Sequence, residues 1–247
     1  MVAGLGGCGD SLSQLAAGEQ GRVAYVRSGD TLVLDDGVVV RLAGIDAPSW
    51  DEPFGREAAA ALTRMTAGRE VELFYGGARR DSYGRALSHV RLKNGRVWLQ
   101  HKLLQDGAAW VRTYPDNRAL AAPMLAAEAK ARLARRGLWS IGDYQVRLPM
   151  EAQGQTGFMV LEGRVTGAYD AAGAAELDLD DIVTARIPQG EVRGFWRAGR
   201  DPGRLKGRLV RVRGYLSRDR SLRLDHPEQL EVLRDRRSDA RRWRRTP

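Results

Sequence analysis

Short runs of alternating hydrophobic and polar residues dominate positions 21–140 and predict β-strands. Apolar residues recur every three to four positions from Phe54 to Met65, which predicts a helix, and Gly68 stands where its C-terminal cap belongs. Two more helices are predicted over residues 99–105 and 120–136. The strands are expected at residues 23–25, 31–34, 38–42, 70–75 and 85–92. Five short strands with three helices are typical of a small Greek-key barrel of the oligonucleotide-binding (OB) type.

A second series of short strands follows a stretch rich in Gly, Pro and polar residues, positions 140–155, which we interpret as a linker. The strands are expected at residues 158–165, 176–179, 182–187, 209–216 and 221–224, with a further edge at 230–233. Five antiparallel strands in about 80 residues suggest a second small OB-like β-barrel. We therefore expect a mainly β, α+β chain. Its expected parts are a flexible N-terminus (1–20), a first domain (21–143), a second domain (155–233) and a basic flexible tail (234–247).

The net charge of the chain indicates which class of partner it binds. The net charge of +9 favours a polyanion such as nucleic acid or an anionic membrane surface. Seven arginines against two aspartates place +5 of that charge in residues 234–247, so the folded body is only mildly basic. No apolar run approaches the roughly 18 residues that a transmembrane helix needs.

The single cysteine, Cys8, excludes an internal disulfide framework and a multi-cysteine zinc site. Its context, Leu5-Gly6-Gly7-Cys8, is similar to the cleavage box of a bacterial lipoprotein, but the basic and hydrophobic regions of such a signal do not precede it. Two interpretations stay open: a lipid anchor at Cys8 with a start further upstream, or an unstructured N-terminus with a free thiol. The cell envelope or secretion is favoured over the cytoplasm, and we expect a monomer.

Three oxygen ligands are expected close together in the first domain. A tight turn over residues 35–37 pairs position 31 with 41 and position 30 with 42, so Asp30 and Arg41 are neighbours across a hairpin. Pro48 holds Ala47 in an extended conformation, which presents Asp46 and the Ala47 carbonyl just beyond a strand end. Two carboxylates with a backbone carbonyl form a set of hard oxygen ligands that suits Ca²⁺ and suits neither zinc nor copper.

Two arginines can add phosphate recognition to this set. Arg85 ends a basic turn, residues 79–85, that leads into a predicted strand. The guanidinium groups of Arg41 and Arg85 each offer a planar pair of donors, which can bind one phosphate in a bidentate manner. A metal ion with two arginines suits phosphoryl chemistry.

Five short motifs follow one another within residues 21–140. They are Ser28-Gly29-Asp30-Thr31, Arg41-Leu42-Ala43-Gly44-Ile45-Asp46-Ala47-Pro48, Phe54-Gly55-Arg56-Glu57-Ala58, Asp81-Ser82-Tyr83-Gly84-Arg85 and Gly137-Leu138-Trp139. In this order and at this spacing they resemble the staphylococcal nuclease (thermonuclease) family. The resemblance implies a five-stranded barrel with three helices and a Ca²⁺-dependent phosphodiesterase that cuts DNA and RNA to leave 3′-phosphate ends.

The resemblance also implies roles for individual residues. It implies Ca²⁺ ligation by Asp30, Asp46 and the Ala47 carbonyl, phosphate clamping by Arg41 and Arg85, and nucleotide contact by Tyr83 and Tyr114.

One position departs from the family pattern. The family carries a glutamate after its Asp-x-Pro motif, and that residue is credited with activating the attacking water, whereas this chain has Ser49. A serine hydroxyl does not accept a proton usefully near neutral pH, and general-base catalysis is typically worth about 10²–10⁴-fold. Asp51 and Glu52 are the candidate replacements. We expect weakened or replaced base chemistry; full activity through one of these carboxylates and loss of catalysis are the alternatives.

In the second domain, basic and apolar residues alternate along the predicted strand 209–216 and place Arg211 and Arg213 on one face. Such a face can guide a nucleic-acid backbone, and a solvated outer face is the alternative. The sequence as a whole predicts a Ca²⁺-dependent nuclease whose C-terminal barrel helps to hold its substrate or a partner. The alternative is a catalytically impaired module that binds nucleic acid or a partner on a nuclease scaffold.

Overall fold

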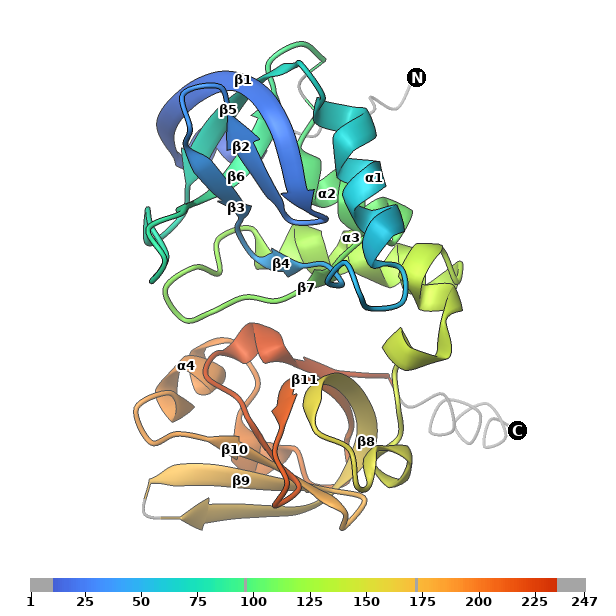
Figure 1. Ribbon diagram of the computed structural model, residues 1–247. Coiled ribbons are helices and arrows are strands. Elements are labelled where there is room, and N and C mark those ends of the chain that lie inside the picture. The colour runs from blue at the N-terminus through green and yellow to red at the C-terminus, as the bar shows by residue number, and fades with distance from the viewer. Residues whose placement is uncertain (1–10, 96, 172, 235–247) are drawn as a thin grey trace, which may run out of the picture. The chain divides into compact units, whose positions relative to one another are not determined.

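A computed structural model describes residues 11–95, 97–171 and 173–234 of the chain (Figure 1). Two compact units divide between Asp143 and Tyr144, and each is described by itself. Cys8 and residues 235–247 of the predicted basic tail lie outside the described residues. In the described part of the chain, no helix combines the length and the apolar character that a membrane span requires.

A closed five-stranded barrel forms the first unit, with the strand order β1-β2-β3-β6-β5 (Figure 1). The barrel is filled by the apolar positions of its strands, and Leu32, Val40, Val71 and Val90 are completely buried. Every neighbouring pair of strands is antiparallel except β3 and β6, which run parallel. The predicted OB-type barrel is therefore confirmed. The strands are β1 (Ala16–Ser28), β2 (Thr31–Leu34), β3 (Val39–Leu42), β5 (Glu70–Tyr75) and β6 (Ala86–Leu92).

Three α-helices and a small two-stranded sheet also belong to the described part of this unit. Leu62, Leu103 and Met124, one from each helix, belong to the same buried cluster as the barrel interior. The small sheet joins two segments that are far apart in the sequence, because Asp46 lies opposite Trp110. The helices are α1 (Gly55–Thr66), α2 (Leu99–Asp106) and α3 (Ala121–Leu133), and the small sheet pairs β4 (Ile45–Asp46) with β7 (Trp110–Val111).

The hairpin of β2 and β3 has the register that the sequence predicts. Thr31 lies opposite Arg41. The backbone N–H of Leu42 donates to the carbonyl of Asp30 at 2.9 Å, so residues 30 and 42 also face each other. The turn allows this register because Gly37 adopts a φ of 86°, a left-handed conformation that glycine tolerates. The prediction that Asp30 and Arg41 are cross-strand neighbours is confirmed.

The first unit begins earlier than the expected boundary at residue 21. Leu12, in a short 3₁₀ helix (Ser11–Gln14), is 1% exposed, and β1 already pairs with β5 at Ala16 opposite Tyr75. Residues 11–20 are therefore part of the fold and not a flexible terminus. The pattern missed them because the start of β1 is mostly exposed, so its place is set by backbone pairing and not by apolar alternation.

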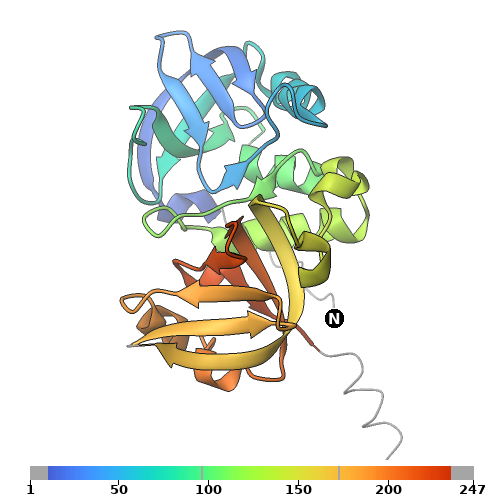
Figure 2. The same cartoon turned by 60° about the horizontal axis from the view of Figure 1, so that its bottom comes forward.

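The second unit is a second barrel with the same strand topology, shown from another side in Figure 2. Pairing of β11 with β12 closes it, and β13 extends it along β11. The expectation of five antiparallel strands is wrong for one pair, because β10 and β12 run parallel. The connection through α4 and β11 returns the chain beside β10 in the same direction. The elements are β8 (Gly157–Ala171), β9 (Ala174–Leu179), β10 (Val183–Ile187), α4 (Val192–Arg197), β11 (Leu209–Leu216), β12 (Ser221–Arg223) and β13 (Leu230–Val232).

Most of the segment interpreted as a linker packs on the second barrel. Ala152 is 1% exposed and belongs to the second buried cluster. The backbone N–H of Arg147 donates to the carbonyl of Val160, in β8, at 3.0 Å. The hydrophobic period lapses here because short 3₁₀ helices, including Pro149–Ala152, bury single residues and not a continuous face.

Candidate active site

Two carboxylates and a guanidinium meet where β3 leads into β4. Nη2 of Arg41 lies 3.2 Å from Oδ2 of Asp30 and also pairs with Oδ1 of Asp46. The three side chains are only 12–14% exposed. Asp30 immediately precedes β2, Arg41 lies in β3 and Asp46 ends β4, so the hairpin and the next strand together build the cluster.

The carboxylate of Asp30 is held by four donors. The hydroxyls of Ser28 and Thr31 donate to Oδ1 at 2.8 and 2.9 Å, and the backbone N–H of Ala47 donates to Oδ2 at 3.0 Å beside the Arg41 contact. A Cβ at Gly29 would lie 2.6 Å from the Cβ of Ala47, so the absence of a side chain there permits this close approach. The structure therefore brings Ala47 to Asp30.

Both terminal nitrogens of Arg41 are engaged by local acceptors. Its Nη1 donates to the carbonyls of Leu42 and Ile45 at 2.7 and 2.8 Å, while Nη2 contacts the two carboxylates. In this arrangement the single positive charge of the guanidinium is shared between Asp30 and Asp46. Binding of a phosphate by Arg41 requires an exchange of some of these contacts.

Arg112 is part of the cluster and was missed by the sequence analysis. Its Nη1 pairs with Oδ2 of Asp46, and its backbone N–H donates to the carbonyl of Gly44 at 2.9 Å. The pairing of β4 with β7 places it there, across 66 residues of sequence. No short motif marks a contact of that range, and the two-residue strand β7 is too short to give a periodic signal.

The donor set at this cluster fits a hard cation. Asp30 and Asp46 approach closely enough to share one guanidinium nitrogen, and carboxylate oxygens are the ligands that Ca²⁺ prefers. Within the described residues, no group of three or more His, Cys, Asp or Glu side chains could hold a metal ion. A cation here would therefore combine these two carboxylates with backbone carbonyls, such as that of Ala47, and water. It would compete with Arg41 for the same oxygens.

A hollow of about 460 Å³ adjoins Asp30, because Ser28 and Thr31, which bind its carboxylate, also line the hollow. Arg85 lines it too, and its Nε binds Oδ2 of Asp81 at 2.6 Å. Its two terminal nitrogens have no hydrogen-bond or ion-pair partner among the described residues. Arg85 is thus oriented by Asp81 and keeps a free pair of donors for a phosphate.

The Asp81 carboxylate is itself well held. Its Oδ1 accepts the backbone N–H groups of Tyr83 and Arg85 at 2.9 and 3.0 Å. Burial by itself raises the pKa of Asp81, but these hydrogen bonds and the Arg85 side chain outweigh burial, so the pKa lies below its ordinary value. Asp81 therefore stays charged and keeps its ion pair with Arg85.

The two tyrosines lie next to the arginines of the site. The guanidinium of Arg85 lies 5.3 Å from the ring centre of Tyr83, which is 83% exposed. The guanidinium of Arg112 lies 5.3 Å from the ring centre of Tyr114, which is 48% exposed. Exposed aromatic faces beside arginines are suited to stacking on nucleotide bases.

Glu52 folds back onto Ser49. Its Oε2 accepts the Ser49 backbone N–H at 2.6 Å, and its own N–H donates to the Ser49 carbonyl at 3.0 Å. The turn is so tight that a Cβ at Gly55 would lie 1.7 Å from that carbonyl oxygen. The side chain of Asp51 is exposed and has no polar contact with the described residues. Of the two candidate carboxylates, Glu52 is thus the one held beside position 49.

The expected basic track on β11 is replaced by an ion-pair network. Arg211 binds Glu162 at 2.8 Å and Glu231 at 3.1 Å. Arg213 binds Glu231 at 3.0 Å, and its side chain is 2% exposed. The acidic residues lie directly opposite Arg211 on the strands to either side, β8 and β13. The alternation along one strand does not reveal such cross-strand partners, so this pair does not form an exposed phosphate track.

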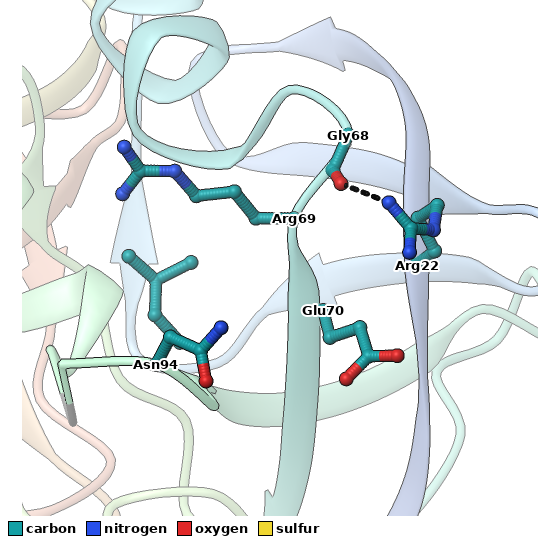
Figure 3. A pocket seen from close by; sticks show the side chains of 6 residues that line it. Arg22, Gly68, Arg69, Glu70 and Asn94 are labelled. Atoms are coloured by element: carbon teal, nitrogen blue, oxygen red, sulfur yellow. Dashed lines mark hydrogen bonds between the residues drawn. The ribbon is translucent and has the colours of Figure 1, made fainter.

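A second hollow of the first unit, about 370 Å³, lies beside the residues that follow the C-terminal end of α1 (Figure 3). Arg22 donates there to the carbonyl of Gly68, just after the helix, at 2.7 Å. Its wall also contains Arg69, Glu70 and Asn94. None of the residues predicted from the sequence to act on a substrate lines it.

Comparison with known proteins agrees with this geometry. A family model described as "Staphylococcal nuclease homologue" matches residues 39–141. An "Uncharacterized endonuclease" of Escherichia coli is 36% identical over 133 residues, which cover 52% of this chain and 82% of that protein. The "Thermonuclease" of Staphylococcus hyicus is 30% identical over 128 residues, which cover 48% of this chain and 75% of that protein. "Probable staphylococcal-like nuclease CAN2" of Oryza sativa subsp. japonica is 35% identical over 106 residues, 42% of this chain and 26% of that protein.

Asp30 precedes the segment that the family model matches, yet the fold brings it to Arg41 inside that segment. The barrel, the motifs and the relatives whose lengths are mostly covered all agree. This chain belongs to the family of staphylococcal nuclease homologues.

Proposed function

We propose that this protein is a Ca²⁺-dependent phosphodiesterase that hydrolyses DNA or RNA. Its family and its nuclease homologues support a hydrolase that acts on nucleic acids. The observation that carries the proposal is the meeting of Asp30, Asp46 and Arg41 beside a hollow that also contains Arg85. Carboxylates for a hard cation next to free guanidinium donors complement a phosphodiester group.

Each residue of the site has a distinct task in this proposal. Arg85, oriented by Asp81, binds the non-bridging phosphate oxygens through its terminal nitrogens. Arg41 adds a second pair of donors when its carboxylate contacts are exchanged. Asp30, Asp46 and the Ala47 carbonyl would hold Ca²⁺, which would act as a Lewis acid toward a phosphoryl oxygen. Tyr83 and Tyr114 hold the neighbouring nucleotides by stacking.

The general base is the second part of the proposal. Ser49 cannot supply it, so we assign proton removal from the attacking water to Glu52, whose carboxylate is held against the Ser49 backbone at 2.6 Å. Because Glu52 reaches this place from three residues further along the chain, we expect slower turnover than a directly placed glutamate would give.

A digestion time course tests the metal and the cluster together. Plasmid and single-stranded DNA are incubated with Ca²⁺ or with EDTA, using the parent protein, Asp46→Ala and, as a matched control, Asp36→Ala at the exposed hairpin turn. We expect cutting that requires Ca²⁺, is unchanged in Asp36→Ala and falls at least about 100-fold in Asp46→Ala. Cutting that persists equally in EDTA would refute the metal dependence.

The base is tested in the same assay by Glu52→Gln, with Asp51→Asn as the neighbouring control. We expect Glu52→Gln to slow cutting by about 10²-fold or more and Asp51→Asn to have little effect. Equal rates for both variants would refute the assignment. Nucleic-acid binding without any cutting above the Asp46→Ala background would favour the alternative, a binding module that lost catalysis when serine came to occupy position 49.

A further inference from the structure

An aromatic groove lies on the second unit, and no residue of the β11 ion-pair network lines it. Its volume is about 280 Å³, and it lies between the β8–β9 hairpin, α4 and the turn at residues 201–203. Small residues, among them Ala168 and Ala175, contribute to its wall. Tyr169 and Trp196 also line it, and they are 57% and 56% exposed. Two large aromatic side chains that are exposed beside the same groove are typical of an interaction site.

The ring of Tyr169 is held in place from below. A Cβ at Gly167 would lie 2.5 Å from Cε2 and Oη of Tyr169, so the tyrosine ring lies directly over the glycine on the same face of β8. The hydroxyl end of the ring is therefore packed against the strand, and more than half of the side chain stays open to solvent. A ring fixed in this way loses little conformational freedom when a flat group stacks on it.

Three arginines lie within four residues of Trp196, on or just after α4. Arg193 and Arg197 on α4 are exposed, and Arg200 follows the helix. These three guanidinium groups have no hydrogen-bond or ion-pair partner in the described part of the chain. Residues 192–204 contain four arginines against one aspartate. The charge beside the groove therefore suits an anion.

The two carboxylates that line the groove are already engaged. Oδ1 of Asp170 accepts the backbone N–H of Gly173 at 2.8 Å. Asp201 accepts the backbone N–H of Gly203 at 3.1 Å and pairs with Arg204 at 3.2 Å. A neutral, flat group suits the groove itself, whereas an anionic group suits the arginines of α4 outside it.

We propose that this groove binds single-stranded nucleic acid, with bases stacked on Tyr169 and Trp196 and phosphates beside the arginines of α4. Only a single strand exposes both base faces and backbone charge in this way, since the bases of a duplex are stacked on each other. The site goes beyond the proposed nuclease function, because it needs neither Ca²⁺ nor hydrolysis. The groove would also give the second barrel a nucleic-acid-binding surface, in place of the track that the sequence predicted at Arg211 and Arg213.

Binding by the full chain tests the proposal in EDTA, so that the nuclease site stays idle. The probes are fluorescein-labelled 12-mers of deoxythymidine and of uridine, titrated by anisotropy in about 0.15 M salt. We expect Trp196→Ala and Tyr169→Ala each to weaken binding at least about five-fold, the lower end for loss of one base stack. Trp196→Phe keeps an aromatic face and should stay within about two-fold of the parent.

The matched control is Tyr25→Ala, which removes a tyrosine of the same 57% exposure from β1 of the first unit and should leave affinity unchanged. Arg197→Gln should reduce the slope of log affinity against log salt by about 0.7, as expected for one phosphate contact. Thermal melting of each variant checks that it is folded. Both aromatic positions are more than half exposed, so folding should be preserved.

Several results would overturn the proposal. Folded Trp196→Ala that binds the oligonucleotides as tightly as the parent shows that the groove takes no part. The groove would be a protein-docking site instead if a proline-rich peptide bound in a way that depends on Trp196 while oligonucleotide binding did not depend on Trp196. Asp46→Ala separates the two proposals: it should abolish cutting and leave Trp196-dependent binding intact, whereas loss of that binding would place the bound strand at the nuclease site.

Discussion

The buried amide of Gln100 offers a sharp test of what holds the site scaffold together. This side chain of α2 is completely buried. Its Oε1 accepts the backbone N–H of Val90 and the indole N–H of Trp98, both at 3.1 Å. Its Nε2 donates to the carbonyl of Ser88 at 2.9 Å and, at 3.4 Å, to that of Ala43. One side chain thus joins α2, β6 and the turn that leads to β4. We predict that Gln100→Leu, of similar volume, destabilises the first unit.

The size of the expected loss of stability follows from the groups that lose a hydrogen bond to Gln100. The Val90 N–H in the barrel wall is left without its acceptor, which costs about 1–3 kcal/mol. The indole of Trp98 is only partly buried, so water compensates some of its loss. The Ser88 carbonyl keeps the backbone N–H of Ala43 at 2.9 Å. We expect the free energy of unfolding of the first unit to fall by about 2–4 kcal/mol.

Urea unfolding followed by hydrogen exchange measures this loss unit by unit, since a two-unit chain need not unfold in one step. Gln105→Leu is the matched control, because it makes the same change on the same helix at a half-buried side chain that has no polar contact with the described residues. It should change stability by less than about 0.5 kcal/mol. Equal losses in the two variants, or no loss in Gln100→Leu, would show that the amide network contributes no net stability.

Three further predictions concern pH, a tight turn and the phosphate arginine. Burial lowers the pKa of His89 from 6.5 to about 4, so the unfolded chain binds this proton first as pH falls. The free energy of unfolding therefore loses nothing to His89 protonation above pH 6.5, and it falls by about 3 kcal/mol as the pH drops to 4. His89→Gln should flatten that part of a curve of unfolding free energy against pH. Gly55→Ala places a Cβ 1.7 Å from the Ser49 carbonyl oxygen and should cost about 2 kcal/mol or more in thermal unfolding, whereas Gly142→Ala, with open space around it, should cost little. Asp81→Asn keeps an acceptor for two backbone N–H groups but removes the charge that orients Arg85; cutting should slow by about ten-fold, with melting nearly unchanged.

The sequence predicts best where structure is decided locally. The β2–β3 hairpin follows from its turn, and the turn fixes that Arg41 lies beside Asp30 and opposite Thr31. The tight approach of Glu52 to Ser49 is local as well, because a few residues of turn suffice to bring the two together. In such segments, a few residues with strong conformational preferences determine the geometry, and no distant partner can alter the register.

Long-range pairing explains what the sequence did not reveal. Arg112 reaches Asp46 only because two short strands pair across 66 residues of sequence. Glu162 and Glu231 lie on separate strands on either side of Arg211, so the alternation within β11 suggested an exposed face that does not exist. Trp196 lies on a helix of six residues, too short for periodicity to show which side chain faces out. The contacts of Arg112 and Arg211 are thus set by sheet topology and not by neighbouring residues.

The charge balance of the cluster suggests why its parts belong together. Two carboxylates, Asp30 and Asp46, are matched by two guanidinium groups, Arg41 and Arg112, so the cluster is formally neutral. A neutral cluster attracts a phosphate weakly. If the carboxylate oxygens bound a Ca²⁺ ion instead, the ion would add two positive charges to the cluster, and the guanidinium of Arg41, no longer paired with them, would be available to the substrate. Under the proposed function, the residues that bind the cation therefore also regulate how strongly the phosphate is held, and affinity for each should rise in the presence of the other.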